Sequence, residues 1–132
     1  ATQAAIFWLW HAPPLYSAAL SINALYWTMQ ISLVGTALGF WFALFRASAP
    51  SAVSALLATM VQMGLLGALI TFAGAPLYAP HQATTEPWGF SPLEDQQLAG
   101  LIMWVPSAGI YLAAALSIAY RWLANESRVD AK

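Results

Sequence analysis

Long apolar runs, separated by a few charged residues, dominate the pattern of this chain. No Asp, Glu, Lys or Arg occurs in residues 1–45, 47–85 or 96–120. Each run exceeds the roughly 20 residues that a helix needs to cross the hydrocarbon core of a bilayer. The runs lack the alternation typical of strands, and an open sheet edge is not tolerated in lipid. The pattern therefore predicts an all-α fold, a polytopic transmembrane helix bundle.

Proline and glycine divide these runs into four elements. Residues 4–10 are apolar but too few to span a bilayer, and Pro13-Pro14 predicts that their helix ends near His11. We interpret this element as the end of a preceding helix. Three full spanning helices are expected after it, at about residues 22–45, 52–73 and 92–123.

The last of these helices has a recognisable start and an internal proline. Ser91 and Glu94 have the spacing of a capping box, with Pro92 at the first helical position. Asp95 is not needed for this cap, so it either complements the helix dipole or has a functional role. Pro106 is expected to kink the helix because proline removes a helical hydrogen bond.

Small residues predict where the helices pack against each other. The second element contains Gly35 and Gly39, and the third contains Gly64 and Ala68. Small residues four apart allow helix backbones to approach closely in a membrane. Packing within the chain is the expected use of both pairs.

Composition supports a membrane protein and excludes several functions. Of the 132 residues, 61% are hydrophobic and 7% are charged, whereas soluble domains average about a quarter charged residues. The net charge of −1 gives no sign of nucleic-acid binding. The absence of cysteine excludes disulfides and thiolate metal sites. We interpret residues 1–132 as a single membrane domain, a fragment of a longer multi-helix protein.

The basic residues predict the orientation in the membrane. Three crossings place all of them on one side, which the positive-inside rule makes cytoplasmic: Arg46, Arg121, Arg128 and Lys132. Residues 46–51 and the C-terminus are therefore expected in the cytoplasm, and loop 76–91 outside.

The expected outer side carries four candidate metal ligands: His11, His81, Asp95 and Met103. Copper suits imidazole and thioether ligands. The histidines and the methionine also have structural interpretations: His11 as a wetted side chain at the membrane interface, His81 as a solvated side chain of the loop, and Met103 as a packing residue. Gln96, Gly100 and Met103 share one helical face, with Gln96 expected to bond across to a neighbouring helix.

Known catalytic signatures are absent from the chain. It contains no GxSxG, HExxH, Walker loop or CxxCH sequence. We therefore expect no enzymatic activity.

Three blocks of the sequence resemble a known family. They are Trp10-His11-Ala12-Pro13 followed by Tyr16, Pro76-Leu77-Tyr78 with His81, and the long block from residue 88 to residue 106. Together they resemble the bacterial caa3-type cytochrome c oxidase assembly factors, which are CtaG-like membrane proteins. The residues that match the family pattern are His11, His81, Asp95, Gln96, Gln97, Met103 and Trp104.

The resemblance implies a non-enzymatic role in the bacterial inner membrane. An assembly factor would assist copper supply or insertion at the outer face, with haem-copper oxidase subunits and the lipid bilayer as its partners. One position departs from the pattern: Gln30 stands where many family members have histidine, and glutamine is a poor copper ligand. The alternative is a structural accessory subunit of a respiratory membrane complex that binds no metal. A small transporter ranks last, because few polar residues lie within the apolar runs.

Overall fold

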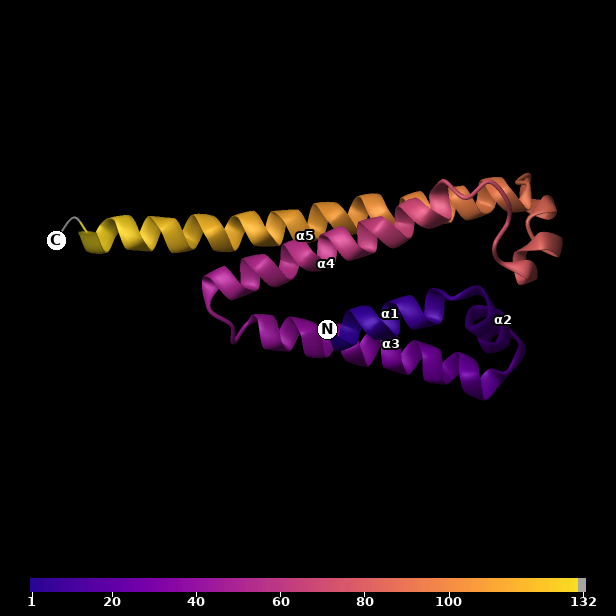
Figure 1. Ribbon diagram of the computed structural model, residues 1–132, viewed down its shortest axis with the longest axis horizontal. Helices are drawn as coiled ribbons and strands as arrows, with labels where there is room; N and C mark the ends of the chain where they lie inside the picture. Colours follow the sequence, from indigo (N-terminus) through magenta and orange to yellow (C-terminus); the bar gives the residue numbers. More distant parts are fainter. Residues whose placement is uncertain (131–132) are drawn as a thin grey trace.

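The computed structural model describes residues 1–130, and in this range every regular element is a helix (Figure 1). Three helices are long and apolar enough to cross a membrane. They are α3 (Asn23–Leu44), α4 (Ala49–Thr71) and α5 (Pro92–Asp130). The expected all-α bundle with three spanning helices is confirmed.

Two short helices precede α3 and form a corner. α1 (Thr2–His11) ends where the prolines predicted, with Ala12 in an extended conformation. Pro13 and Pro14 then begin a second short helix, α2 (Pro13–Ser21), which was not predicted. Proline ends a preceding helix but suits the first turn of a following one, because the first helical N–H groups have no partner within the helix.

The ends of the long helices differ slightly from the expected ones. α4 begins three residues before the expected Ala52, because Pro50 is accepted in its first turn. α5 continues past Leu123 to Asp130 and runs through Pro106 without interruption. Figure 1 shows no sharp bend in α5, so the kink expected at Pro106 is not seen. Lys132, one of the four basic residues used for orientation, lies outside the described residues.

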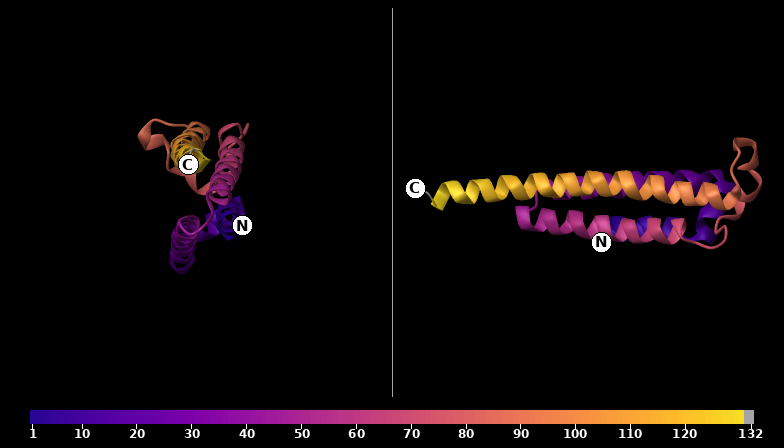
Figure 2. Two further views of the ribbon diagram at one scale, coloured as in Figure 1. Left: turned by 90° about the vertical axis from the view of Figure 1, so that its left-hand side faces the viewer. Right: turned by 90° about the horizontal axis from the view of Figure 1, so that it is seen from above.

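The helices form two groups. α4 and α5 lie side by side as an antiparallel pair, and α1, α2 and α3 form the second group (Figures 1 and 2). Leu44 of α3 joins the groups at one end by packing with Leu56 and Tyr111. A second cluster of Trp10, Ala19 and Met29 holds α1, α2 and α3 together.

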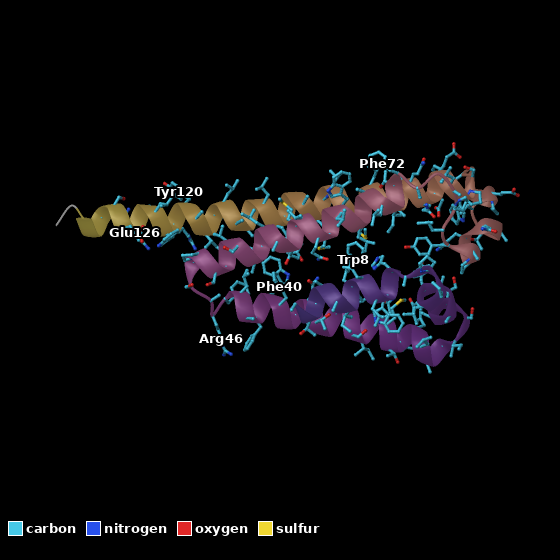
Figure 3. All side chains as sticks on the ribbon, in the orientation of Figure 1. Trp8, Phe40, Arg46, Phe72, Tyr120 and Glu126 are labelled. Atoms are coloured by element: carbon cyan, nitrogen blue, oxygen red, sulfur yellow. The ribbon has the colours of Figure 1, made fainter. Side chains whose placement is uncertain are left out.

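A polar contact links the two groups between these clusters. The indole Nε1 of Trp8 donates to the Gln62 side chain at 2.7 Å, and Figure 3 shows Trp8 between α1 and α4. In an apolar environment without water as an alternative partner, breaking this hydrogen bond would leave both polar groups unpaired at a cost in free energy. It fixes α1 against α4.

Glycine allows α4 and α5 to approach closely near Trp104. A Cβ atom on Gly67 would lie 2.6 Å from the Trp104 Cβ and 3.3 Å from the carbonyl oxygen of Gly100. A Cβ on Gly64 would lie 2.9 Å from the Trp104 indole nitrogen. The expected packing role of Gly64 within the chain is confirmed.

The glycines of α3 behave differently. A Cβ on Gly35 or Gly39 would have no atom within 4 Å. The expectation that this pair packs within the chain is therefore wrong for the part of the chain that the structure describes.

The connections lie at opposite ends of the bundle. One end of the bundle carries the turn between α3 and α4, and the C-terminal end of α5 lies at this same end (Figure 1). The other end carries α2 and the loop between α4 and α5, with two short 3-10 helices, η1 (Ala79–Ala83) and η2 (Glu86–Trp88). We call this second end the loop end.

Candidate functional site: a cavity at the loop end

A cavity of about 560 Å³ lies at the loop end. Its walls come from α1, α2, the end of α4, the loop and the first turns of α5. The polar or aromatic side chains that line it are His11, Tyr16, Tyr78, His81, Thr84, Thr85, Trp88, Asp95 and Gln96, and Met103 adds a thioether.

All four candidate metal ligands from the sequence line this one cavity: His11, His81, Asp95 and Met103. Residues up to 92 positions apart in sequence are thus brought to a common space. No group of three or more His, Asp or Glu residues within residues 1–130 is close enough to hold a metal ion. The structure gathers the candidate donors without forming a closed ligand cluster.

His11 has a defined proton position. Its Nδ1 lies 2.7 Å from the carbonyl oxygen of Phe7, and a carbonyl can only accept. Nδ1 therefore carries the proton, which leaves the lone pair of Nε2 free. Burial lowers the pKa of His11, although the bond to Phe7 acts in the opposite direction. The neutral ring is the form that can bind a metal.

Two tyrosines tie the loop to α1 and α2. The Tyr78 hydroxyl donates to the backbone carbonyl of His11 at 2.9 Å, and the Tyr16 hydroxyl lies 3.0 Å from Nε2 of His81. The Tyr16 and Tyr78 rings pack edge to face at 5.0 Å. Burial raises the pKa of both tyrosines, so both hydroxyls remain protonated. The position of His81 depends on these contacts.

The first turn of α5 confirms the capping box. Glu94 Oε2 accepts from the Ser91 backbone N–H at 2.8 Å and from the Ser91 hydroxyl at 2.7 Å. The Glu94 N–H faces the Ser91 hydroxyl oxygen at 3.3 Å. Glu94 is thus used by the cap, whereas half-buried Asp95 lines the cavity. The negative charge of Asp95 is the second cause, after burial, of the raised pKa of Tyr16.

Gln96 bonds across to the end of α4, as its position on the helix face predicted. Its Oε1 accepts from the Leu77 backbone N–H at 2.6 Å. Its Nε2 donates to the carbonyl oxygens of Ile70 at 3.2 Å and Ala75 at 3.5 Å. With an exposed fraction of 5%, the side chain replaces water for three backbone groups. Gln96 holds the chain that leads from α4 into the loop.

The other residues of the family pattern, and the departing Gln30, lie outside the cavity lining. Trp104 packs against Gly64 and Gly67, and the backbone carbonyl of Gln97 accepts from Thr71 at 3.5 Å. Gln30 donates to the Tyr26 hydroxyl at 2.9 Å. These residues contribute packing and local hydrogen bonds in the described structure.

Sequence reasoning missed the structural roles of the tyrosines and of the loop residues at the cavity. Tyr16 and Tyr78 entered only through the resemblance, and Thr85 and Trp88 were not singled out. A tyrosine lies close in sequence to each histidine, as Tyr78 does three residues before His81. This proximity was a signal from which the hydrogen-bonding role of the tyrosines could have been predicted. Thr85 is 4% exposed, and its hydroxyl has no hydrogen-bond partner among residues 1–130.

The fold and the cavity define a polytopic helical membrane protein with potential metal donors gathered at one end. Residues 1–125 match the cytochrome c oxidase caa3 assembly factor family. The chain belongs to this family, as the resemblance indicated. No curated protein and no solved structure matches it.

Proposed function

We propose that this protein assists the assembly of a caa3-type oxidase by holding copper, as cargo, in the cavity at the loop end. The cavity faces the outer side of the bacterial inner membrane in this proposal. The partners are haem-copper oxidase subunits, and the protein acts without catalytic turnover. The observation that supports the proposal is that His11, His81, Asp95 and Met103 line one cavity in a chain of the assembly factor family.

The chemistry of the donor set fits copper. Imidazole and thioether are ligands that Cu(I) accepts, and the cavity offers two imidazoles and one thioether. The hydrogen bond from His11 to Phe7 is the kind of contact that orients a metal-binding imidazole. Asp95 adds a negative charge that favours a cation.

Copper binding by the reconstituted protein tests the proposal. We expect the purified protein in lipid to bind Cu(I), and we expect binding to fall in His11→Ala and in Asp95→Ala because each loses a donor. The measurement is the amount of bound copper per protein against a competing Cu(I) chelator. Unchanged stoichiometry in both variants would contradict the site.

A matched pair of methionine variants separates ligation from packing. Met103→Leu removes the thioether at nearly constant volume and is expected to weaken Cu(I) binding. Met63→Leu makes the same change at a residue that packs against the cluster around Leu56, and it should bind copper as the wild type does. Stoichiometric co-purification of a copper-free protein with the mature oxidase would instead support an accessory subunit.

A further inference from the structure

His81 has one ring nitrogen in a hydrogen bond and one without a partner in the described part of the chain. Nε2 lies 3.0 Å from the Tyr16 hydroxyl, which can either donate or accept. If Tyr16 donates, Nε2 uses its lone pair to accept this bond and the ring proton lies on Nδ1. Neither nitrogen then has a free lone pair for a metal. If Nε2–H donates to the Tyr16 oxygen, the lone pair of Nδ1 is free.

We propose that Tyr16 is a positioning residue that accepts a hydrogen bond from Nε2–H of His81, so that His81 presents Nδ1 to Cu(I) in the cavity. This inference rests on the proposed copper function of the same cavity. Tyr16 does not contact the metal. It selects which nitrogen of His81 can bind.

The contacts of the two histidines support this assignment. A metal-binding imidazole usually donates its second N–H to an oxygen acceptor, which fixes the tautomer and the ring orientation. His11 has this arrangement through Nδ1 and the carbonyl of Phe7. Tyr16 supplies the only oxygen that bonds to the His81 ring among the described residues. The two histidines would then bind through opposite nitrogens, Nε2 of His11 and Nδ1 of His81.

The packing of Tyr16 suits it for this role. Its ring lies 5.7 Å from the His81 ring and 5.0 Å from the Tyr78 ring. Tyr78 is in turn bonded to the backbone of His11. The Tyr16 ring is therefore held by its neighbours, which fixes the position of its hydroxyl oxygen, as a residue that orients a ligand requires.

Nitrogen-15 NMR of the metal-free protein tests the tautomer directly. The chain has only two histidines, so protein labelled at the histidine ring nitrogens and purified without a polyhistidine tag gives two sets of ring signals. His11→Ala and His81→Ala assign them. We expect the proton of His11 on Nδ1 and that of His81 on Nε2. A wild-type His81 with its proton on Nδ1 would overturn the proposal.

Tyr16→Phe and Tyr78→Phe form a matched pair. Each removes one hydroxyl that ties the loop to the helices, but only Tyr16 touches a ring nitrogen. Tyr16→Phe is expected to abolish the single tautomer of His81 and to weaken Cu(I) binding about 10- to 100-fold, as the loss of an outer partner of a ligand does. Tyr78→Phe keeps the contact between Tyr16 and His81, so the ring proton of His81 should stay on Nε2.

The outcomes separate the two proposals. Equal changes of the His81 signals in both variants would mean that Tyr16 acts only as a loop tether, which would refute its positioning role. Copper binding by Tyr16→Phe with wild-type affinity would refute that role as well and leave the copper function intact. A wild-type protein that binds no Cu(I) would refute the copper function, and with it the inference that depends on it.

Discussion

The side chain of Gln96 holds the end of α4 and the chain beyond it against α5. It bonds to Ile70 in the last turn of α4 and to Ala75 and Leu77 beyond that helix. The turn after α4 exposes backbone groups that lack helical partners, and burial would make these costly without a substitute. One amide on α5 satisfies them and thereby places the start of the loop that carries Tyr78 and His81.

Gln96→Leu is expected to loosen this loop. The change leaves the N–H of Leu77 without its 2.6 Å partner and removes the donor from the buried contact with the Ile70 carbonyl, where an unpaired polar group costs about 1–3 kcal/mol. Hydrogen exchange at the Leu77 amide should accelerate, and Cu(I) binding should weaken because the position of His81 becomes less defined. Gln97→Leu serves as the control, since Gln97 contributes its backbone carbonyl to the contact with Thr71. Equal exchange rates in the two variants would contradict this role of Gln96.

At the scale of elements, the pairing of α4 with α5 depends on the glycines beneath Trp104. Gly67→Ala is expected to lower the free energy of unfolding by about 1–3 kcal/mol, because overpacking displaces neighbouring atoms and a Cβ would meet the Trp104 Cβ at 2.6 Å. Gly39→Ala is the matched control, with nothing within 4 Å of the added atom. Unfolding in detergent micelles measures both variants. A destabilised Gly39→Ala beside an unchanged Gly67→Ala would show that the α4 and α5 contact is misassigned.

The long helices could be predicted because their signals are local. Apolar length determines a spanning helix, and the capping box at Ser91 and Glu94 lies within four residues. The short helix α2 was missed because Pro13 and Pro14 end one helix and begin another, and the prolines were interpreted only as an end. The unpaired face at Gly35 and Gly39 could not be foreseen, because a small-residue spacing does not name its partner.

The convergence of the cavity residues likewise could not be predicted from local sequence patterns. Sequence predicted that His11, His81 and Asp95 lie on one side of the membrane, but their separation depends on contacts between distant segments. The contact from Tyr78 to His11 spans 67 residues, and that from Tyr16 to His81 spans 65. Such contacts have no local pattern, so only the folded chain shows which polar groups share a cavity.

At the scale of the whole molecule, the length of α5 bears on how the protein sits in a membrane. Its 39 residues correspond to roughly 58 Å of helix, well beyond the roughly 30 Å of a hydrocarbon core. Arg121 and Arg128 lie near the C-terminal end of α5, and that end lies on the same side of the bundle as Arg46 (Figure 3). Figure 1 shows α5 extending beyond α4 at this basic end, which the positive-inside rule predicts to be the cytoplasmic one.

Cysteine labelling tests this orientation on a chain that contains no cysteine of its own. Gln82→Cys places a thiol on the loop of the cavity, and Ser48→Cys places one on the turn after Arg46; both positions are exposed. In intact bacterial cells, a membrane-impermeant maleimide should label the first variant at once and the second only after permeabilisation. The opposite result would put the cavity on the cytoplasmic side. Copper held there could not be supplied from outside the membrane, so this experiment decides whether the proposed site and the proposed direction of supply agree.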